Sequence, residues 1–280
     1  MKQKAKIKPF DVVHVIIFII ISIFVLIPIY KVLVDSFDLR VSSGLRLFPQ
    51  VFGLEGYKTV LTYPTIVHPF MISCLTTVVG TFLGLLISTL GGYTLIQYKM
   101  PGRTFIANFL LFKMIFNGGM IPTYLVIQGL HMTNTLWAVL LPQAVSVYNI
   151  VLMRNFFDGI PESLFEAAEI DGCTPLQSFF KIALPLSKAA LASIGLMCAV
   201  GYWNDYTNYK LYITNSNLYN FQMKLRDLIL GSDMPGTTEG VSDNTVRNAA
   251  VIVAIIPFMI IYPFCQKYFV QGVNIGAVKE

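Results

Sequence analysis

Residues 157–188 carry the densest group of side chains able to do chemistry, because five of the fifteen acidic residues lie there among apolar ones. Such a mixture suits a surface that docks another protein. The chain contains no H-E-x-x-H or G-x-S-x-G pattern, and without a Gly-Lys dipeptide it has no G-x-x-x-x-G-K-[ST] phosphate loop. The three histidines and four cysteines are scattered, with neither metal-ligand nor disulfide spacing. We therefore expect no catalytic centre and no metal.

A helix, a glycine and a second helix are predicted within this segment. Pro161 suits a first helical turn, Glu162 complements the positive end of the helix dipole, and Gly172 is the expected C-terminal stop. Thr174 is the expected N-cap of the second helix, with Pro175 at its first position. The first helix has an apolar side formed by Leu164, Phe165, Ala168 and Ile170. The pattern predicts an elbow that projects into the cytoplasm.

The elements that hold this elbow are predicted to cross a membrane. Only 12% of the residues are charged and 55% are hydrophobic, whereas a soluble domain has about 25% charged residues. The stretches 59–98 and 114–153 contain no Asp, Glu, Lys or Arg, and each can cross a hydrocarbon core of ~30 Å more than once. This composition excludes a soluble enzyme, a disordered protein and a nucleic-acid binder. It predicts an all-α polytopic membrane protein with six transmembrane helices at about 12–34, 67–96, 104–127, 136–156, 189–206 and 248–269.

The lysines and arginines predict the orientation. Lys2, Lys4, Lys6 and Lys8 precede the first span, and the short turn after the second span is also basic, so both are expected on the cytoplasmic side. The first apolar run is too long for a signal peptide and has no Ala-x-Ala site after it, so we expect an uncleaved span. We therefore predict a cytoplasmic N-terminus (1–11), a single transmembrane domain (12–280) containing the loop 157–188, and a cytoplasmic C-terminus.

The loop also resembles a known family. Glu166-Ala167-Ala168, then Gly172, then Ile182-x-Leu184-Pro185 resembles the EAA loop of ABC-importer permease subunits, with every fixed element at the family spacing. The resemblance covers most of the chain. Further similarity to one branch of carbohydrate-importer permeases, associated with oligosaccharides and polysaccharide fragments, lies at 117–124, 154–157, 170–172, 203–204 and 272–279.

This resemblance implies the type I ABC-importer permease fold, in which a cytoplasmic coupling helix sits in a cleft of an ATPase subunit. It assigns the coupling role to Glu166, Ala167, Ala168, Asp171, Gly172, Ile182, Leu184 and Pro185. It implies a second permease subunit forming a heterodimer, two ATP-binding-cassette ATPases that bind ATP and Mg, and an extracellular or periplasmic solute-binding protein. The chain itself is then a non-enzymatic subunit without a cofactor, surrounded by lipid in the plasma or inner membrane, that moves a sugar substrate.

Candidate residues for the substrate path come from polar and aromatic side chains in the spans. Lys113 lies about mid-membrane, where a cation costs roughly 3 kcal/mol, so it either lines the path or forms a structural ion pair. Asn117 begins an Asn-Gly-Gly break, which either lines a cavity or is a packing kink. Trp203, Asn204, Asp205 and Tyr206 are groups that bind sugars, although aromatic residues also anchor spans at the membrane interface.

Other functions remain open at this point. A permease of the same class could carry a peptide or phosphate. An ion-coupled secondary transporter would show acidic or paired charges at mid-membrane and inverted repeats, whereas this chain has only Lys113 there and no visible repeat. A scaffold protein of the membrane would not need the full loop spacing.

Overall fold

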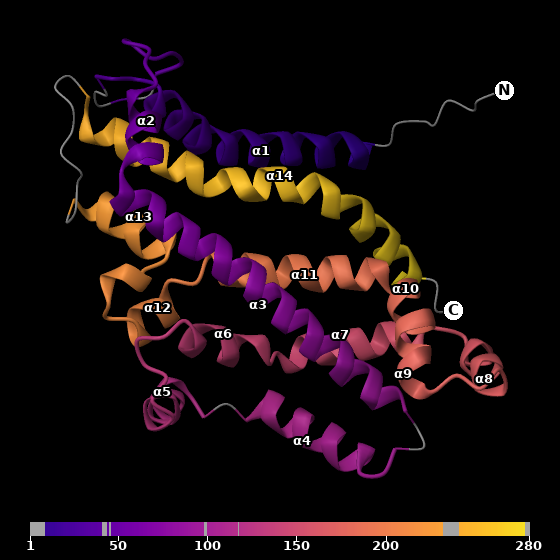
Figure 1. Ribbon diagram of the computed structural model, residues 1–280. Helices are drawn as coiled ribbons and strands as arrows, with labels where there is room; N and C mark the ends of the chain where they lie inside the picture. Colours follow the sequence, from indigo (N-terminus) through magenta and orange to yellow (C-terminus); the bar gives the residue numbers. More distant parts are fainter. Residues whose placement is uncertain are drawn as a thin grey trace. The chain divides into compact units, whose positions relative to one another are not determined.

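The computed structural model describes residues 9–40, 44, 46–97, 100–116, 118–231 and 241–277, and within these helices the side chains of 9, 11, 265 and 267–277 are left undescribed. Helices make up most of the described chain, and no strand occurs in it beyond an isolated bridge between Asp38 and Phe52 (Figure 1). The predicted all-α class is confirmed.

Three helices are long and apolar enough to cross a membrane by themselves: α1 (Pro9–Ser36), α3 (Pro64–Ile96) and α14 (Asp243–Ala277). Each contains proline, which a bundle tolerates because neighbours satisfy the freed backbone groups. These helices coincide with the first, second and sixth predicted spans.

The third and fourth predicted spans coincide with bent helix pairs, whereas the fifth coincides with the second helix of such a pair. α4 (Arg103–Ile115) and α5 (Met120–Gly129) meet at 119°, and α6 (Trp137–Ala144) and α7 (Val147–Asp158) at 42°. The stretch Pro175–Leu186 meets α11 (Lys188–Trp203) at 81°. The described chain thus has three spans, or six if each bent pair crosses as one.

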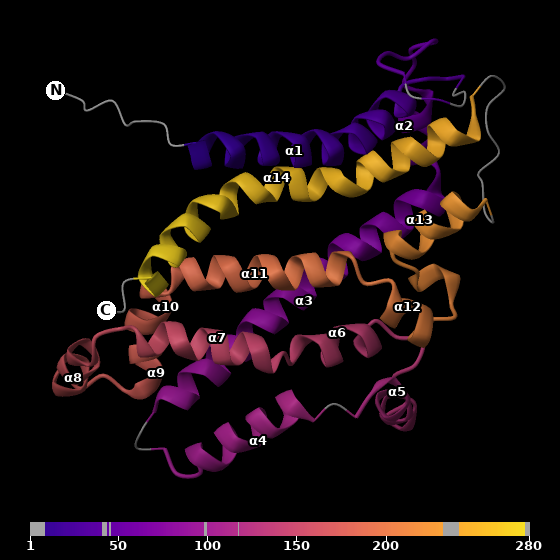
Figure 2. The ribbon, with the colours of Figure 1, turned by 180° about the vertical axis from the view of Figure 1, so that it is seen from behind.

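The remaining elements are short. They are α2 (Glu55–Thr62), α8 (Glu162–Ile170), α9 (Pro175–Ser178), a π-helical turn (Phe179–Ala183), α10 (Leu184–Leu186), α12 (Thr207–Tyr212), a 3-10 turn (Ser216–Leu218) and α13 (Phe221–Leu230). Figure 2 shows the same elements from behind.

The chain divides into two compact units, the first being Met1–Val67 with Leu225–Ile256. Most side chains of α1 are exposed, as expected of a span whose neighbours are lipid or another subunit. The loop after α1 is folded around Asp38. Its buried carboxylate accepts hydrogen bonds from the backbone N–H groups of Arg40 (3.1 Å), Gln50 (2.9 Å) and Val51 (3.2 Å). The Thr245 hydroxyl of α14 donates to the Asp38 carbonyl.

The second unit, His68–Lys224 with Pro257–Glu280, contains a buried apolar cluster that includes Tyr93, Phe157 and Phe179. Glycines let α3 approach α7 closely there. A Cβ at Gly92 would lie 2.9 Å from the Arg154 amide nitrogen and 3.0 Å from the Met153 Cβ. α11 packs against both α6 and α7. This packing supports the elbow that follows α7.

Candidate functional site

The first helix of the elbow ends as its sequence predicts. Gly172 has φ +77°, the left-handed region that glycine adopts without strain. Its N–H donates to the Glu169 carbonyl (3.1 Å), and the Cys173 N–H donates to the Ala168 carbonyl (2.8 Å). This pair of bonds is the Schellman arrangement that closes a helix C-terminus. α8 itself starts at Glu162, so Pro161 lies just before the first turn rather than in it.

The second helix of the elbow is fixed by a capping box. The Thr174 hydroxyl accepts a hydrogen bond from the Gln177 N–H (3.3 Å), and the Gln177 side-chain oxygen accepts one from the Thr174 N–H (2.9 Å). The predicted N-cap is therefore confirmed. The chain continues through a π-helical turn that contains Ile182 and then through α10, which contains Leu184 and Pro185. Both ends of the turn around Gly172 are thus held by local hydrogen bonds.

Tyr93 attaches this elbow to α3. Its hydroxyl donates a hydrogen bond to the Pro175 carbonyl at 2.9 Å. Its ring lies 5.0 Å from the Phe179 ring, 5.9 Å from the Phe157 ring and 6.5 Å from the Phe165 ring, measured between centroids. Tyr93, Phe157 and Phe179 are buried in one apolar cluster with residues of α7 and α11. The elbow is therefore anchored to α3, α7 and α11 through this buried apolar cluster.

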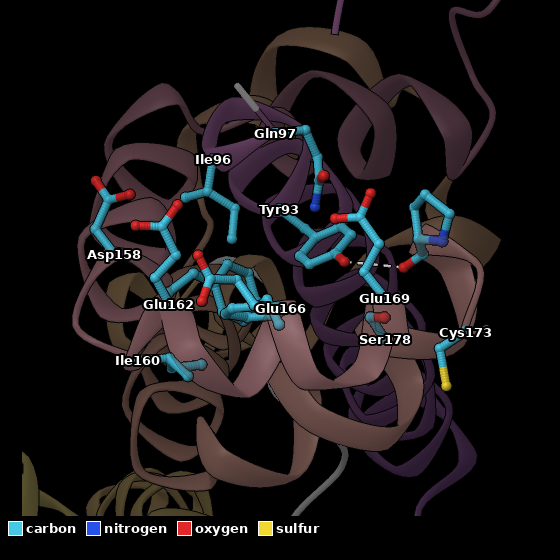
Figure 3. Close-up of a pocket in the computed structure, with 13 residues that line it drawn as sticks. Tyr93, Ile96, Gln97, Asp158, Ile160, Glu162, Glu166, Glu169, Cys173 and Ser178 are labelled. Atoms are coloured by element: carbon cyan, nitrogen blue, oxygen red, sulfur yellow. Dashed lines mark hydrogen bonds between the residues drawn. The ribbon is translucent and has the colours of Figure 1, made fainter. Parts of the chain in front are cut away.

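A hollow of about 380 Å³ opens between α8 and the end of α3 (Figure 3). Four carboxylates line it, those of Asp158, Glu162, Glu166 and Glu169. The remaining lining residues are Tyr93, Ile96, Gln97, Phe157, Ile160, Phe165, Cys173, Pro175 and Ser178. Within the described residues no three His, Cys, Asp or Glu side chains are close enough to hold a metal ion. The hollow therefore offers a negative, partly apolar surface for a basic group.

The outer side of α8 is exposed although it carries apolar side chains. Ile170 is 86% exposed and Leu164 is 42% exposed, whereas Ala168 is buried and Phe165 is half-buried against the aromatic cluster. Three glutamates on the same helix are incompatible with a lipid-facing position. An exposed mixture of this kind is typical of a protein–protein interface. The predicted apolar side thus divides into an inward half and an exposed half.

The predicted group at residues 203–206 is mostly buried in the second unit. Trp203 is 3% exposed and packs edge-on against Phe70 and Phe258. The Asp205 carboxylate accepts hydrogen bonds from the Asn208 backbone N–H (3.1 Å) and its side-chain amide (2.9 Å). Asn204 is exposed and Tyr206 is half-buried. Asn204 is therefore the member of this group with the most access to a solute.

Two buried polar contacts fix the chain after Asp205. The Asn220 side chain donates to the Asp205 carbonyl at 2.6 Å, and the Ser73 hydroxyl accepts a hydrogen bond from the Phe221 N–H at 2.8 Å. Asn220 is fully buried. These bonds hold the segment after α11 against α3, so Trp203 and Asp205 lie in the packed interior and not at an open surface.

Lys113 makes a separate contact. It is exposed on the last turn of α4, and its ammonium donates to the Val145 carbonyl, 3.4 Å away at the bend between α6 and α7. Asn117 lies outside the described residues, so its predicted role stays a prediction. The two helices on either side of it, α4 and α5, are separate, as the Asn-Gly-Gly break predicts.

No motif in the sequence points to Tyr93. Its partners Phe157, Phe165, Pro175 and Phe179 lie far along the chain, so no local spacing connects them to it. The available local signal is the pair Gly91-Gly92 just before it, because two small residues on one helix allow close approach of another.

Taken together, these features are those of a multi-pass membrane protein with an exposed acidic and apolar helix suited to docking another protein. The chain belongs to the family of binding-protein-dependent transport system inner membrane components, whose model matches residues 7–275. The predicted family is therefore confirmed, and a multi-pass position in the inner membrane follows from membership. Members of this family work with a binding protein, as its description states.

The chain is similar over nearly its whole length to proteins of Bacillus subtilis (strain 168). It is 37% identical to protein LplC over 279 residues, covering 96% of this chain and 95% of LplC. It is 36% identical to the polygalacturonan/rhamnogalacturonan transport system permease protein YtcP over 280 residues, covering 96% and 98%.

A solved structure has the same fold. It is the crystal structure of a bacterial ABC transporter involved in the import of the acidic polysaccharide alginate, with a TM-score of 0.87 and 30% identity. The match covers 93% of this chain and 96% of the chain in that structure. The predicted ABC-importer permease fold is therefore confirmed.

Proposed function

We propose that this chain is the permease subunit of an ATP-driven importer that carries oligosaccharides or polysaccharide-derived sugars into the cytoplasm by alternating access. Two matches with a stated cargo support a saccharide, since YtcP is named for polygalacturonan and rhamnogalacturonan and the solved transporter for alginate. The observation that supports coupling of transport to the ATPases is the structure of the elbow. An exposed acidic and apolar helix, α8, is anchored by buried aromatic side chains to long helices of the second unit.

The coupling role belongs to the exposed face of the elbow. Glu166, Ala167 and Asp171 are exposed and available to an ATPase subunit, whereas Ala168 faces the core. Gly172 sets the turn, and Ile182, Leu184 and Pro185 lie in the segment that leads to α11. Movement of α8 would thus reach the spans through the chain on both sides of the elbow.

The remaining partners follow from this assignment. A second permease subunit completes the pore as a heterodimer, two ATPase subunits bind ATP and Mg, and a solute-binding protein delivers the sugar from outside. This chain would contribute no catalytic group. Its N- and C-termini lie in the cytoplasm, which places α8 on the same side as ATP.

Reconstitution tests the function. The chain, its partner permease and the ATPases are placed in vesicles, and uptake of an oligosaccharide is measured with the binding protein outside and ATP at the ATPase face. We expect uptake only when ATP, ATPases and binding protein are all present. Uptake driven by an ion gradient without ATPases would show a secondary transporter instead. ATP-dependent uptake of peptide or phosphate, but of no sugar, would show that the importer carries a non-sugar cargo.

A further inference from the structure

Two bent spans change direction beside Lys113. α4 ends at Ile115, two residues after Lys113, and α6 gives way to α7 at Val145 and Ser146 with a bend of 42°. Non-helical backbone at membrane depth is tolerated where it is buried in protein or lines a water-filled cavity. Val145 is 44% exposed and α4 has no buried residue. The chain by itself therefore does not bury this region, which favours a cavity completed by the rest of the importer.

Lys113 has no acidic partner within the described part of the chain. No carboxylate among those residues lies within 4.0 Å of its ammonium, and the stretches 59–98 and 114–153 contain no Asp or Glu at all. Helices α3, α5 and α6 therefore cannot supply one. The Val145 carbonyl, at 3.4 Å, occupies one of the three N–H donors of the ammonium.

A cation at the mid-membrane depth that the sequence predicts for Lys113 requires a partner or water. Burial of an unpaired charge in a membrane is costly, and such residues therefore face a cavity and mark pathways of ions or substrates. Two N–H donors of Lys113 remain for a group outside this chain. An anion would satisfy them best, because a carboxylate accepts the hydrogen bonds and also neutralises the charge of the ammonium.

We propose that Lys113 binds a carboxylate of an acidic oligosaccharide during its passage and so selects uronic-acid saccharides over neutral ones. The inference rests on the proposed function and names the substrate class of the same pore. Alginate and polygalacturonan, the cargoes named for two of the matches, are both polymers of uronic acids. Lys113 is thus a specificity-determining residue.

The test uses the whole importer in vesicles with two probes, trigalacturonate and the galactotriose of the same linkage, which lacks the carboxylates. Uptake of each is measured for the wild type, Lys113→Met and Lys113→Arg, together with the yield of assembled complex. Met keeps the length of the side chain without charge, and Arg keeps the charge. Lys113→Gln, which retains an N–H donor for the Val145 carbonyl, replaces Met if Met prevents assembly.

We expect the wild type to prefer trigalacturonate, Lys113→Met to lower the acid-to-neutral uptake ratio about tenfold, and Lys113→Arg to keep it within about twofold. If the wild type takes up only trigalacturonate, we expect Lys113→Met to lower the rate of trigalacturonate uptake about tenfold while the yield of assembled complex stays unchanged. Equal uptake of both sugars by the wild type would overturn this inference. An unchanged acid-to-neutral ratio, or an unchanged rate of trigalacturonate uptake, in Lys113→Met would do the same. Each of these results would leave the proposed sugar importer standing. Failure of both neutral variants to assemble, with Arg normal, would also overturn it by indicating a structural ion pair. Uptake of neither sugar by the wild type would also overturn this inference, and uptake of no oligosaccharide at all would refute the proposed sugar cargo.

Discussion

The hydroxyl of Tyr93, near the end of α3, donates a 2.9 Å hydrogen bond to the carbonyl of Pro175, the first residue of α9. The two residues are 82 positions apart. This bond and the surrounding aromatic rings join the elbow directly to a long apolar helix. A force applied to α8 would therefore act on α3 as well as on the helices that continue the chain.

The Tyr93→Phe variant tests this connection. It keeps the ring in the aromatic cluster but removes the donor, so we expect a loss of about 1 kcal/mol in the stability of the elbow. Hydrogen exchange of the α9 amides in the purified importer should become faster, and thermal unfolding should begin earlier. Tyr148→Phe is the control, because the Tyr148 side chain is exposed. Equal exchange rates in both variants would contradict a stabilising role for the bond.

Gly92→Ala tests the close approach of α3 and α7. The new Cβ would meet the Arg154 amide nitrogen at 2.9 Å and the Ile150 carbonyl at 3.2 Å, and neither backbone atom can move freely. We expect destabilisation of about 1–3 kcal/mol and a lower yield of assembled importer. Gly129→Ala should change little, because a Cβ there has no neighbour within 4 Å. Similar melting temperatures for the two variants would refute the tight contact.

The local part of this site could be predicted from the sequence, and the long-range part could not. Gly172, Thr174 and Pro175 act on residues within four positions, so their types alone predict a helix stop and a helix start. The bond from Tyr93 depends on how α3 packs against distant segments, which no local pattern records. Trp203 and Asp205 illustrate the same limit. Their types suit a sugar site, yet packing against Phe70 and Phe258 and hydrogen bonds to Asn208 bury them.

Asp38→Asn tests the loop after α1. Burial would raise the pKa of Asp38, but hydrogen bonds from the Gln50, Val51 and Arg40 amides, together with Arg46, outweigh it and lower the pKa below the usual 3.8. The carboxylate therefore stabilises the loop fully above pH 3.8, and this stabilisation is lost as the pH falls through the lowered pKa. Asn keeps the shape but has one acceptor oxygen instead of two.

We expect Asp38→Asn to speed exchange of the Gln50 and Val51 amides at pH 7, where the wild type is protected. In the wild type, after correction for intrinsic exchange rates, protection should hold from pH 7 to pH 5 and decrease only below pH 3.8. Asp243→Asn, at an exposed position, is the control. Loss of wild-type protection already between pH 7 and pH 5 would refute this role of Asp38.

Ile170→Cys tests which side of the membrane α8 occupies. Ile170 is 86% exposed, so a cysteine there should react readily with a membrane-impermeant maleimide in a chain whose native cysteines are replaced by serine. We expect labelling in inside-out vesicles and none in right-side-out vesicles. Addition of the ATPase subunits should slow labelling, because they would cover α8. Labelling from the outer side would invert the proposed orientation.

Coupling through the elbow is measured most directly by comparing sugar uptake with ATP hydrolysis in vesicles that contain Gly172→Pro or Gly172→Asn. Proline cannot adopt the φ of +77° and lacks the N–H that bonds the Glu169 carbonyl, whereas Asn tolerates the left-handed region. We expect Gly172→Pro to insert normally but to lose at least about tenfold in sugar imported per ATP, and Gly172→Asn to stay near the wild type. Normal ATPase association and normal uptake per ATP in Gly172→Pro would contradict coupling through the elbow.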